Sequence, residues 1–525
     1  MPAQSIMALF TKSPPRVSPY VALIPVLAGV FIAADDQTVV VTVLPQIMQD
    51  MKVLVTELDR LSWTVTGYLL GYLAAMPLIG RLSDTWGHRP LFIGSMAGFM
   101  VGSVAVALAP NLELLIVARV FQAIGAGALV PISIAIAGDL FPAGRRALPL
   151  GLIGASAEAG GVIGPLWGGL IPDYMDRLWA NLWSWDVLAG FPGESWLGAA
   201  PGWKWVFWIN IPLAIAVLLL VGWLLGPSPR RAARVDYAGG VLIAVSLAFL
   251  TLGLARIDDI DMLMAAYLLG AGGALWLFIL RQRTFEEPIL PGIMFRATAF
   301  SAANATHLLV GGALIIAMVT IPLMANTVMG LSPLDGGLWL MRLTAAIPIG
   351  AVLGGLASQR MNYRVPTFTG LLLTSLGFLL MAQWDLQISD PELTVHLALT
   401  GMGFGLLIAP IGLAATESVG EDNRGTAAAF ITANRMVGMT LGLAALTAWG
   451  SGRFVGLVGV FRFPLQLQSE TGAQYTQRLV RYEAQVEGAG MTVFNEFFMI
   501  AMVICLLALV PVALMDWRRG RPLPM

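Results

Sequence analysis

The sequence predicts an all-α membrane protein with fourteen transmembrane helices. Of its 525 residues, 57% are hydrophobic and only 12% are charged, whereas soluble domains carry roughly 25% charged residues. Apolar segments of about the 20 residues that a bilayer core requires recur along the whole chain. The 30 Lys and Arg residues nearly balance the 31 Asp and Glu residues, and the resulting net charge of −1 argues against a nucleic-acid partner.

A window of about 20 residues moved along the chain finds the apolar segments in order. The first is longer than the apolar core of a signal peptide and has no small-residue cleavage pattern, so we expect it to remain as a helix. The fourteen segments begin near residues 20, 62, 91, 113, 148, 205, 238, 262, 301, 334, 366, 394, 426 and 492.

An even number of spans places both ends of the chain on one side of the membrane. The connecting segments on that side hold eighteen of the 30 Lys and Arg residues, and those on the other side hold nine. The remaining three, Arg119, Arg342 and Arg435, lie inside spans. Because positive charge favours the cytoplasmic side, we expect both termini, residues 1–19 and 517–525, to be cytoplasmic in a cell-membrane protein.

A short charged segment separates the second and third spans: Gly80-Arg-Leu-Ser-Asp84-Thr-Trp-Gly87-His-Arg89-Pro90. One acid, three basic-type residues and two glycines are typical of a tight turn at a membrane surface, and we expect His88 to be exposed there. A second copy, Gly355-Leu-Ala-Ser-Gln359-Arg-Met-Asn-Tyr-Arg364, follows 275 residues later, with glutamine in place of the acid. Such a repeat predicts two parallel six-helix halves. These are residues 20–226 and 301–516, with spans seven and eight forming an inserted hairpin and linker at 227–300.

Four further motifs follow in order along the chain. They are Asp36-Gln-Thr-Val-Val-Val-Thr-Val-Leu-Pro45, Arg119-Val-Phe-Gln122-Ala-Ile-Gly125, the glycine-rich Gly154–Gly169, and Trp203-Lys-Trp-Val-Phe-Trp-Ile-Asn210-Ile-Pro212. Together with the charged turn, they resemble the fourteen-span drug:proton antiporter family of the major facilitator superfamily. That resemblance implies the major facilitator fold and a secondary transporter without a cofactor, driven by the proton gradient.

Three other stretches are similar to one branch of that family, the mycobacterial exporters of triacylglycerides and related lipids. They are Trp63–Pro77, Asn434–Gly438 and Ala444–Gly450. The resemblance implies lipid export across the inner membrane, assisted in that branch by a periplasmic lipoprotein. A broad multidrug:proton antiporter is the alternative.

Charged residues inside membrane spans are costly and are functional candidates by default. For proton coupling we expect Asp36 paired with Arg435, and Glu158 paired with Arg119, although static structural ion pairing would explain the same residues. Asp35 lies about 100° around the helix from Asp36, and Asp36 is favoured because it aligns with the acid of the family. Arg342 is as compatible with snorkelling to the outer surface as with function.

The charged turn should form a cytoplasmic gate. We expect Asp84 to meet the inner end of span thirteen, near Arg424, where an arginine and the positive end of a helix dipole both favour a carboxylate. The remaining gate residues are Gly80, Gly87 and Arg89.

The fifth span carries the antiporter motif. Its small residues should let a partner helix approach closely, and Pro165 should bend the helix and shape an interface with the second half. Packing without a coupling role is the other interpretation. The residues are Gly160, Gly164, Pro165, Gly168 and Gly169.

Residues 451–490 form an unusual outward segment between the last two spans. We expect ordered helices that continue spans thirteen and fourteen beyond the membrane. Four apolar side chains should line or flank a lipid path there: Phe461, Phe463, Leu465 and Leu467.

Other classes of function are disfavoured. The three lysines do not follow a Gly-x-x-x-x-Gly pattern, so no phosphate-binding loop is expected. Three scattered histidines and one cysteine, Cys505, have no metal-site spacing. No nucleophile–base arrangement of an enzyme is visible. We therefore expect a monomeric transporter for a membrane lipid or a hydrophobic small molecule.

Overall fold

The structure is a computed structural model. It describes residues 17–52, 58–184, 202–228, 236–254, 256, 261–286, 288–331, 333–420, 423–465 and 471–515. Within these ranges, thirteen helices are long and apolar enough to cross a membrane. A fourteenth is counted if α3, which is bent by 44° between Met76 and Leu78, is one span. The prediction of fourteen spans in an all-α protein is confirmed.

The first group of helices begins within a few residues of the predicted starts. Asn111 caps one of them, since its side chain accepts a hydrogen bond from the backbone N–H of Leu114 at 2.9 Å. The helices are α2 (Pro19–Asp50), α3 (Leu58–Trp86), α4 (His88–Ala107), α5 (Leu112–Leu140), α6 (Ala147–Ser184) and α7 (Lys204–Leu224), with a 3-10 turn, η2 (Ala143–Arg145), before α6.

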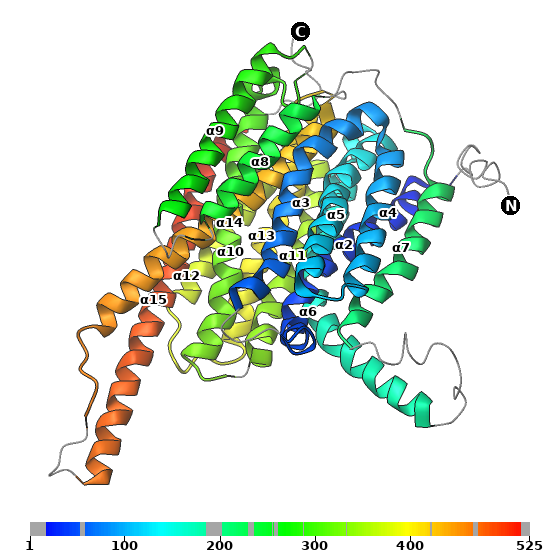
Figure 1. Cartoon of the computed structure of the whole chain (residues 1–525). Coiled ribbons are helices and arrows are strands. Elements are labelled where there is room, and N and C mark those ends of the chain that lie inside the picture. Colours follow the sequence, from blue (N-terminus) through cyan, green and yellow to red (C-terminus); the bar gives the residue numbers. More distant parts are fainter. Residues whose placement is uncertain are drawn as a thin grey trace.

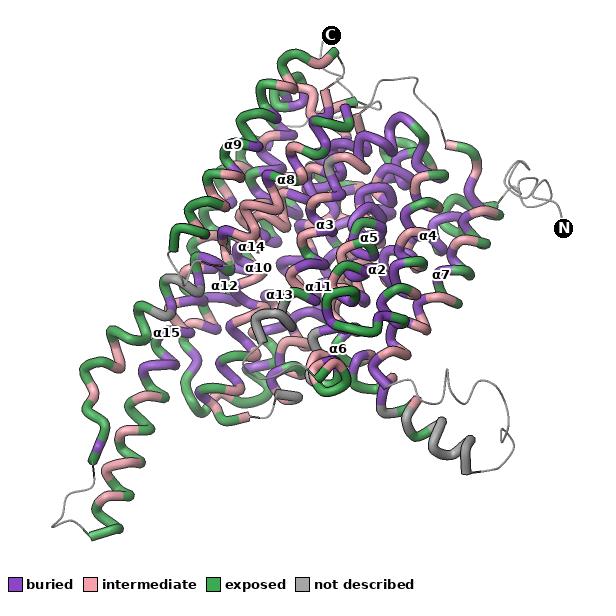
Figure 2. The backbone as a smooth tube through the Cα atoms, in the orientation of Figure 1, coloured by how far each residue is buried: buried purple, intermediate pink, exposed green. Residues whose placement is uncertain are grey.

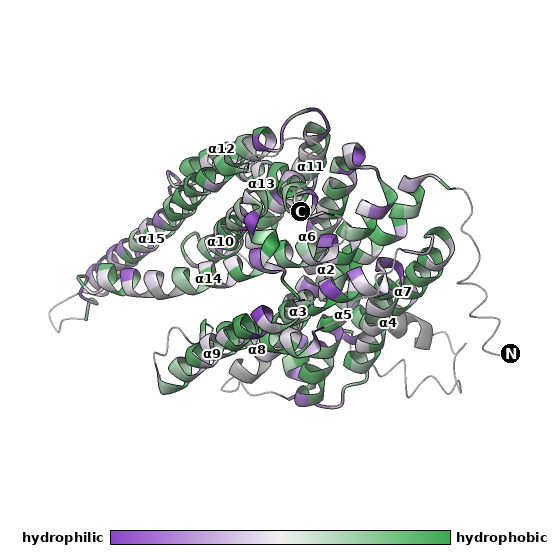
Figure 3. Cartoon of the chain, turned by 90° about the horizontal axis from the view of Figure 1, so that it is seen from above, coloured by the Kyte–Doolittle hydropathy of each residue, from purple (hydrophilic) through white to green (hydrophobic). Residues whose placement is uncertain are grey.

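Two helices form a hairpin between the groups, α8 (Tyr237–Leu254) and α9 (Met262–Thr284). The Ser246 hydroxyl donates to the Ala271 carbonyl across the hairpin at 2.9 Å. Few of their residues are buried, so most of the hairpin surface is left for lipid. α8 packs along α3 at the outside of the molecule (Figures 1 and 3).

The second group repeats the arrangement of the first. Its helices are α10 (Thr298–Thr327), α11 (Pro333–Arg360), α12 (Arg364–Met381), α13 (Glu392–Glu417), α14 (Arg424–Val458) and α15 (Gly472–Leu514), preceded by the 3-10 turn η4 (Gly292–Arg296). Seen along the spans, α2–α7 and α10–α15 form two neighbouring groups (Figure 3). Buried residues concentrate between the helices, while the outward-facing surfaces are exposed (Figure 2).

The two faces of the molecule differ in shape. We call the side on which α2 begins and α15 ends the terminal face, and the opposite side the extension face. On the extension face, α15, the end of α14 and the end of α6 project beyond the other helices (Figure 1). The last span was expected to start near residue 492, but α15 begins at Gly472 because the outward helix and the span are continuous.

Candidate functional site

One fully buried carboxylate organises the first group of helices. Arg119 of α5 donates to Asp36 of α2 at 2.6 Å, and both side chains are almost completely shielded. The amides of Gln122 and Asn210 each donate to the other Asp36 oxygen at 2.9 Å. The Arg119 guanidinium also lies 4.0 Å from the centre of the Tyr68 ring. A buried charge is tolerated when it is paired and hydrogen-bonded in this way.

A second ion pair joins the two groups. Arg435 of α14 donates to Glu158 of α6 at 2.7 Å, and these side chains keep 17% and 15% of their surface exposed. His307 of α10 lines the same small cavity and lies 3.0 Å from the Ile431 carbonyl through Nδ1. This pair therefore borders a small cavity and is divided between the halves, whereas Asp36–Arg119 is sealed within one half.

The predicted pairings are wrong. We expected Asp36 with Arg435 and Glu158 with Arg119, and the structure exchanges the two arginines. The reason is the helix arrangement: α5 packs beside α2 within the first half, whereas α14 reaches α6 across the boundary. All four residues are still brought into the membrane interior.

On the terminal face, Asp84 joins the two halves. We call its contacts with Gly425 and Thr426 the latch. Asp84 at the end of α3 accepts hydrogen bonds from the backbone N–H groups of Gly425 and Thr426, at 2.8 and 2.9 Å, and from the Thr426 hydroxyl at 2.7 Å. The carboxylate therefore caps the N-terminus of α14, where the helix dipole is positive. The expected position of Asp84 is confirmed. The side chain of Arg424 lies against Gly138 of α5.

The charged turn is more compact than expected. α3 continues through Trp86 and α4 starts at His88, so the chain reverses at Gly87, whose φ of 93° favours glycine. His88 is buried rather than exposed, because its ring lies between two carboxylates, 2.6 Å from Asp139 and 3.6 Å from Asp84. Arg89 donates to the Gly222 carbonyl at 2.6 Å and ties the turn to α7.

The repeated motif makes equivalent contacts in the two halves. A Cβ at Gly80 would collide with Ala429 of α14 and would approach the Gly425 carbonyl to 3.0 Å. A Cβ at Gly355, at the end of α11, would lie 2.7 Å from the Ala147 carbonyl at the start of α6. Each half therefore presses a glycine of its motif against the first turn of a helix in the other half. These contacts close the terminal face along α3–α14 and α11–α6.

The antiporter-motif glycines let a partner helix approach closely, as expected, and that helix is α2. Added Cβ atoms at Gly160, Gly164 and Gly168 would collide with α2 within the same half, and those at Gly161 and Gly169 would meet nothing within 4 Å. The predicted interface with the second half is wrong for this stretch. Earlier positions make it instead, since Gly151 and Gly154 face Ala351 of α11 and Ile408 of α13. α6 continues as a helix through Pro165.

A cavity of about 310 Å³ lies between the groups. Its wall comes from α2, α3, α8, α10 and α14, so the inserted hairpin contributes to it directly. Most of the lining is apolar, including Leu69, Ile315, Met436, Met439 and Leu443, and Tyr72 and Gln37 are among the few polar members.

The outward segment is helical at both ends. α14 continues to Val458 and α15 starts at Gly472, with a capping box formed by Thr471 and Gln474. Phe461, Phe463 and Leu465 lie in the non-helical connection between the two helices. Phe463 and Leu465 are 58% and 72% exposed, and Phe463 packs edge-on against Tyr482. Leu467 lies outside the described residues.

Several polar residues of these networks had no predicted role. Gln122 and Asn210 stand in the motifs but were not expected to hydrogen-bond Asp36. Asp139 was not singled out, although a carboxylate at the end of an apolar span beside a charged turn is a usable signal.

Arg342 lies at the surface with Asp390, at 2.7 Å. There, a hydrogen bond from Thr394 and the Arg342 charge hold the pKa of Asp390 below its usual range.

Together, these structural features define the class of protein. Two groups of six helices meet at glycine contacts, enclose a cavity, and share an ion pair across their boundary, which is the architecture of a secondary transporter with alternating access. No group of His, Cys, Asp or Glu able to hold a metal occurs among the residues that the structure describes.

The chain belongs to the Major Facilitator Superfamily, whose family model matches residues 26–443. It is a multi-pass membrane transporter and not an enzyme. It is 34% identical over 511 residues to a triacylglyceride transporter of Mycolicibacterium hassiacum, covering 94% of this chain and 91% of the relative. It is 31% identical to the triacylglyceride transporter of Mycobacterium tuberculosis, covering 94% and 93%. The resemblance drawn from the motifs is confirmed.

Solved structures share the fold at low sequence identity. The human organic anion transporter MFSD10 matches with a TM-score of 0.59 and 14% identity, over 93% of this chain and all of that one. The proton:xylose symporter XylE matches with a TM-score of 0.58 and 12% identity, over 92% and 94%.

Proposed function

We propose that this protein is a proton-coupled exporter of long-chain lipids such as triacylglycerides. The observation that carries the lipid assignment is the apolar cavity between the halves, whose wall of leucine, isoleucine and methionine suits acyl chains. The relatives named as triacylglyceride transporters support the same substrate class. In this proposal the terminal face is cytoplasmic, as the distribution of Lys and Arg favours.

Proton coupling is assigned to Asp36, Arg119, Glu158 and Arg435. Glu158 is the entry point, because its pair with Arg435 is partly exposed and joins the halves. Protonation of Glu158 would remove the attraction that holds α6 to α14, and the halves could then separate. Asp36 is the inner acid, which can take a proton only when Arg119 shifts away from it.

The latch acts as the cytoplasmic gate. Asp84 fixes the first turn of α14 to the end of α3, and the close glycine contacts at Gly80 and Gly355 keep the helices in register. Opening toward the cytoplasm requires both sets of contacts to break. Gly87, Arg89 and Arg424 support the turn and its neighbours. The antiporter-motif glycines hold α6 against α2, so the two helices move as one unit.

The outward extension guides the lipid away from the membrane. Each CH₂ group exposed to water costs about 0.8 kcal/mol, so a long acyl chain needs a continuous apolar surface to leave the cavity. Phe461, Phe463, Leu465 and Leu467 belong to the connection that we assign to this path. A periplasmic lipoprotein is the proposed acceptor, and the protein would work as a monomer.

The test is transport by purified protein in vesicles with an imposed pH gradient. A fluorescent triacylglyceride and a compact cationic dye are followed in parallel. Gradient-dependent movement of the lipid but not of the dye is the expected result. Movement of the dye alone would favour the multidrug antiporter, and movement of the lipid without a gradient would remove proton coupling from the proposal.

A further inference from the structure

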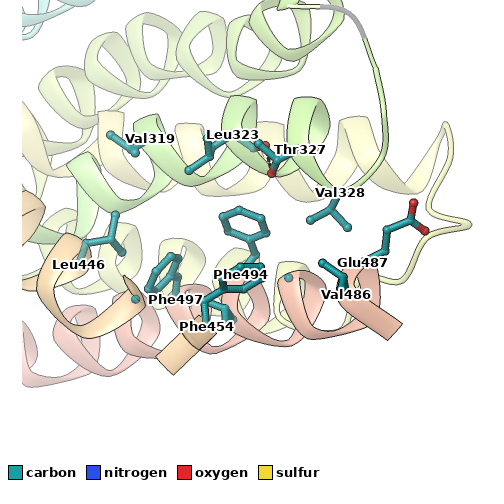
Figure 4. Close-up of a pocket in the computed structure, with 13 residues that line it drawn as sticks. Val319, Leu323, Thr327, Val328, Leu446, Phe454, Val486, Glu487, Phe494 and Phe497 are labelled. Atoms are coloured by element: carbon teal, nitrogen blue, oxygen red, sulfur yellow. Dashed lines mark hydrogen bonds between the residues drawn. The ribbon is translucent and has the colours of Figure 1, made fainter. Parts of the chain in front are cut away.

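A second apolar cavity lies away from the boundary between the halves. It is a groove of about 400 Å³ between α10, α14 and α15, all from the second group. Figure 4 shows Phe454, Phe494 and Phe497 around its middle, with Leu446 near one end and Glu487 at the other. The proposed transport path between the halves does not use this groove.

Two glycines in the lining pack closely against their neighbours. Gly450 of α14 sits directly over the Phe497 ring, and a Cβ at Gly490 of α15 would come within 2.8 Å of Val328. Phe494 and Phe497 are largely buried and form the floor, whereas Leu323 and Phe454 remain 44% and 37% exposed at the rim. The floor is therefore fixed and the rim is accessible.

The position of the groove identifies the kind of molecule that fits it. It runs along α14 from Leu446 to Phe454 and along α15 from Phe497 out to Glu487. Glu487 is the last charged residue of the outer stretch of α15, before the apolar run that starts at Ala489. The groove thus leads from the outer part of the bilayer toward the base of the extension. Its volume falls within the ~300–1,000 Å³ typical of small-molecule sites. Water is a poor occupant, because apolar surface in contact with water costs about 25 cal/mol per Å².

Glu487 places a negative charge at one end of the groove. Among the lining residues that the structure describes, it is the one that carries a charge, and it is exposed at the outer end. An anionic phospholipid with its tail in the groove would bring its phosphate toward this carboxylate, and two like charges repel. An uncharged glyceride has only ester groups at that position.

We infer that this groove binds one acyl chain of an uncharged long-chain lipid at the outer leaflet, and that Glu487 disfavours anionic phospholipids. The lipid would occupy this site on its way from the membrane to the extension. The inference rests on the proposed lipid export. The occupant lies against α10, α14 and α15 and reaches the mouth of the groove at Glu487.

Photo-crosslinking of the full-length protein in phosphatidylcholine nanodiscs tests this inference. One probe is a triacylglycerol with a diazirine in one acyl chain, and the other is a phosphatidylglycerol with the same labelled chain. Peptide mapping should show preferential labelling of residues 486–497 by the triacylglycerol, by about tenfold, which corresponds to ~1.4 kcal/mol. Equal labelling by the two probes, or none in this segment, would overturn the inference.

Matched variants locate the site. Val486→Trp fills the groove and should lower triacylglycerol labelling about tenfold, whereas Val480→Trp, on the same helix but outside the lining, should not. Thr327→Trp fills it from α10 and serves if Val486→Trp does not fold. Glu487→Gln should bring the two probes toward equal labelling, and Glu392→Gln, exposed on the same face, should leave the preference unchanged. Unchanged labelling in Val486→Trp or Thr327→Trp, or an unchanged preference in Glu487→Gln, would contradict the inference.

The readout is occupancy and does not require transport. Selective labelling of the groove without export in vesicles would uphold the site and reject the proposed function. Export of triacylglyceride without labelling of the groove would uphold the proposed function and reject the site.

Discussion

Glu158 and Arg435 form a 2.7 Å ion pair that spans the boundary between the two halves, whereas the buried Asp36–Arg119 pair stays within one half. The two pairs therefore respond differently to motion. Separation of the halves must break the first, and it need not disturb the second.

Replacement of Glu158 by Gln should abolish gradient-driven export while leaving the protein folded. The amide keeps the shape and can still accept a hydrogen bond from Arg435, but it cannot titrate. Glu496→Gln is the matched control, because Glu496 pairs with Arg453 between α15 and α14 at 2.8 Å outside the cavity. Export should be measured in vesicles with an imposed pH gradient. Near wild-type export by Glu158→Gln would remove Glu158 from coupling.

Loss of the Arg119 guanidinium should lower the stability of the folded protein. Arg119→Ala leaves Asp36 buried without its counter-charge, and breaking a buried pair costs about 3–5 kcal/mol. Asp36→Asn should remain folded, because the amide oxygen can still accept hydrogen bonds, but export should be lost. Thermal unfolding in detergent, followed by fluorescence, measures the first effect. Arg256→Ala, in an exposed pair with Asp261, is the control and should leave Tm unchanged.

Asp84→Asn should weaken the latch. A carboxylate at a partly buried helix N-terminus contributes up to about 2 kcal/mol, so the amide should shift the population toward the state open on the terminal face. The chain suits cysteine labelling, because Cys505 is fully buried. An Ala157→Cys reporter should then react faster with a maleimide added to that face. Thr85→Ala, whose hydroxyl bonds only within α3 at 3.0 Å, should not change the rate. An unchanged rate in Asp84→Asn would contradict the latch.

Gly164→Ala should destabilise the protein, whereas Gly161→Ala should not. A methyl group at Gly164 collides with Thr38 and the Asp35 carbonyl, and one at Gly161, three residues away, meets open space. Overpacking of this kind costs about 1–3 kcal/mol, while alanine is the better helix former by roughly 0.5–1 kcal/mol where there is room. The two Tm values should therefore move in opposite directions.

Deletion of the extension should separate lipid export from drug efflux. Removing residues 459–488 and joining α14 to α15 by a short linker should cripple triacylglyceride export, because the acyl chain loses its apolar surface beyond the membrane. Efflux of a compact cationic dye should persist, since such a molecule can diffuse into water. Equal loss of both, or of neither, would remove the extension from the mechanism and favour the multidrug alternative.

The sequence predicted the spans and the latch more successfully than the ion pairs. A span needs only about 20 apolar residues, and the Asp84 contact follows from a short motif and a helix dipole, so both are encoded locally. Which arginine reaches Asp36 depends on which helices are neighbours, and no local pattern around Arg119 or Arg435 states that. The burial of His88 was missed for the same reason, because Asp139 comes from a helix 51 residues further along the chain.

α15 is a single helix of 43 residues. At 1.5 Å per residue it is about 65 Å long, roughly twice the ~30 Å hydrocarbon thickness of a bilayer. Because the helix is so long, a tilt of only about 10° about its inner end would move the outer tip by about 11 Å. A movement near Arg435 no larger than a side chain would thus shift the outer tip by about the width of a helix. A partner resting on the tip could sense which way the transporter faces without touching its cavity.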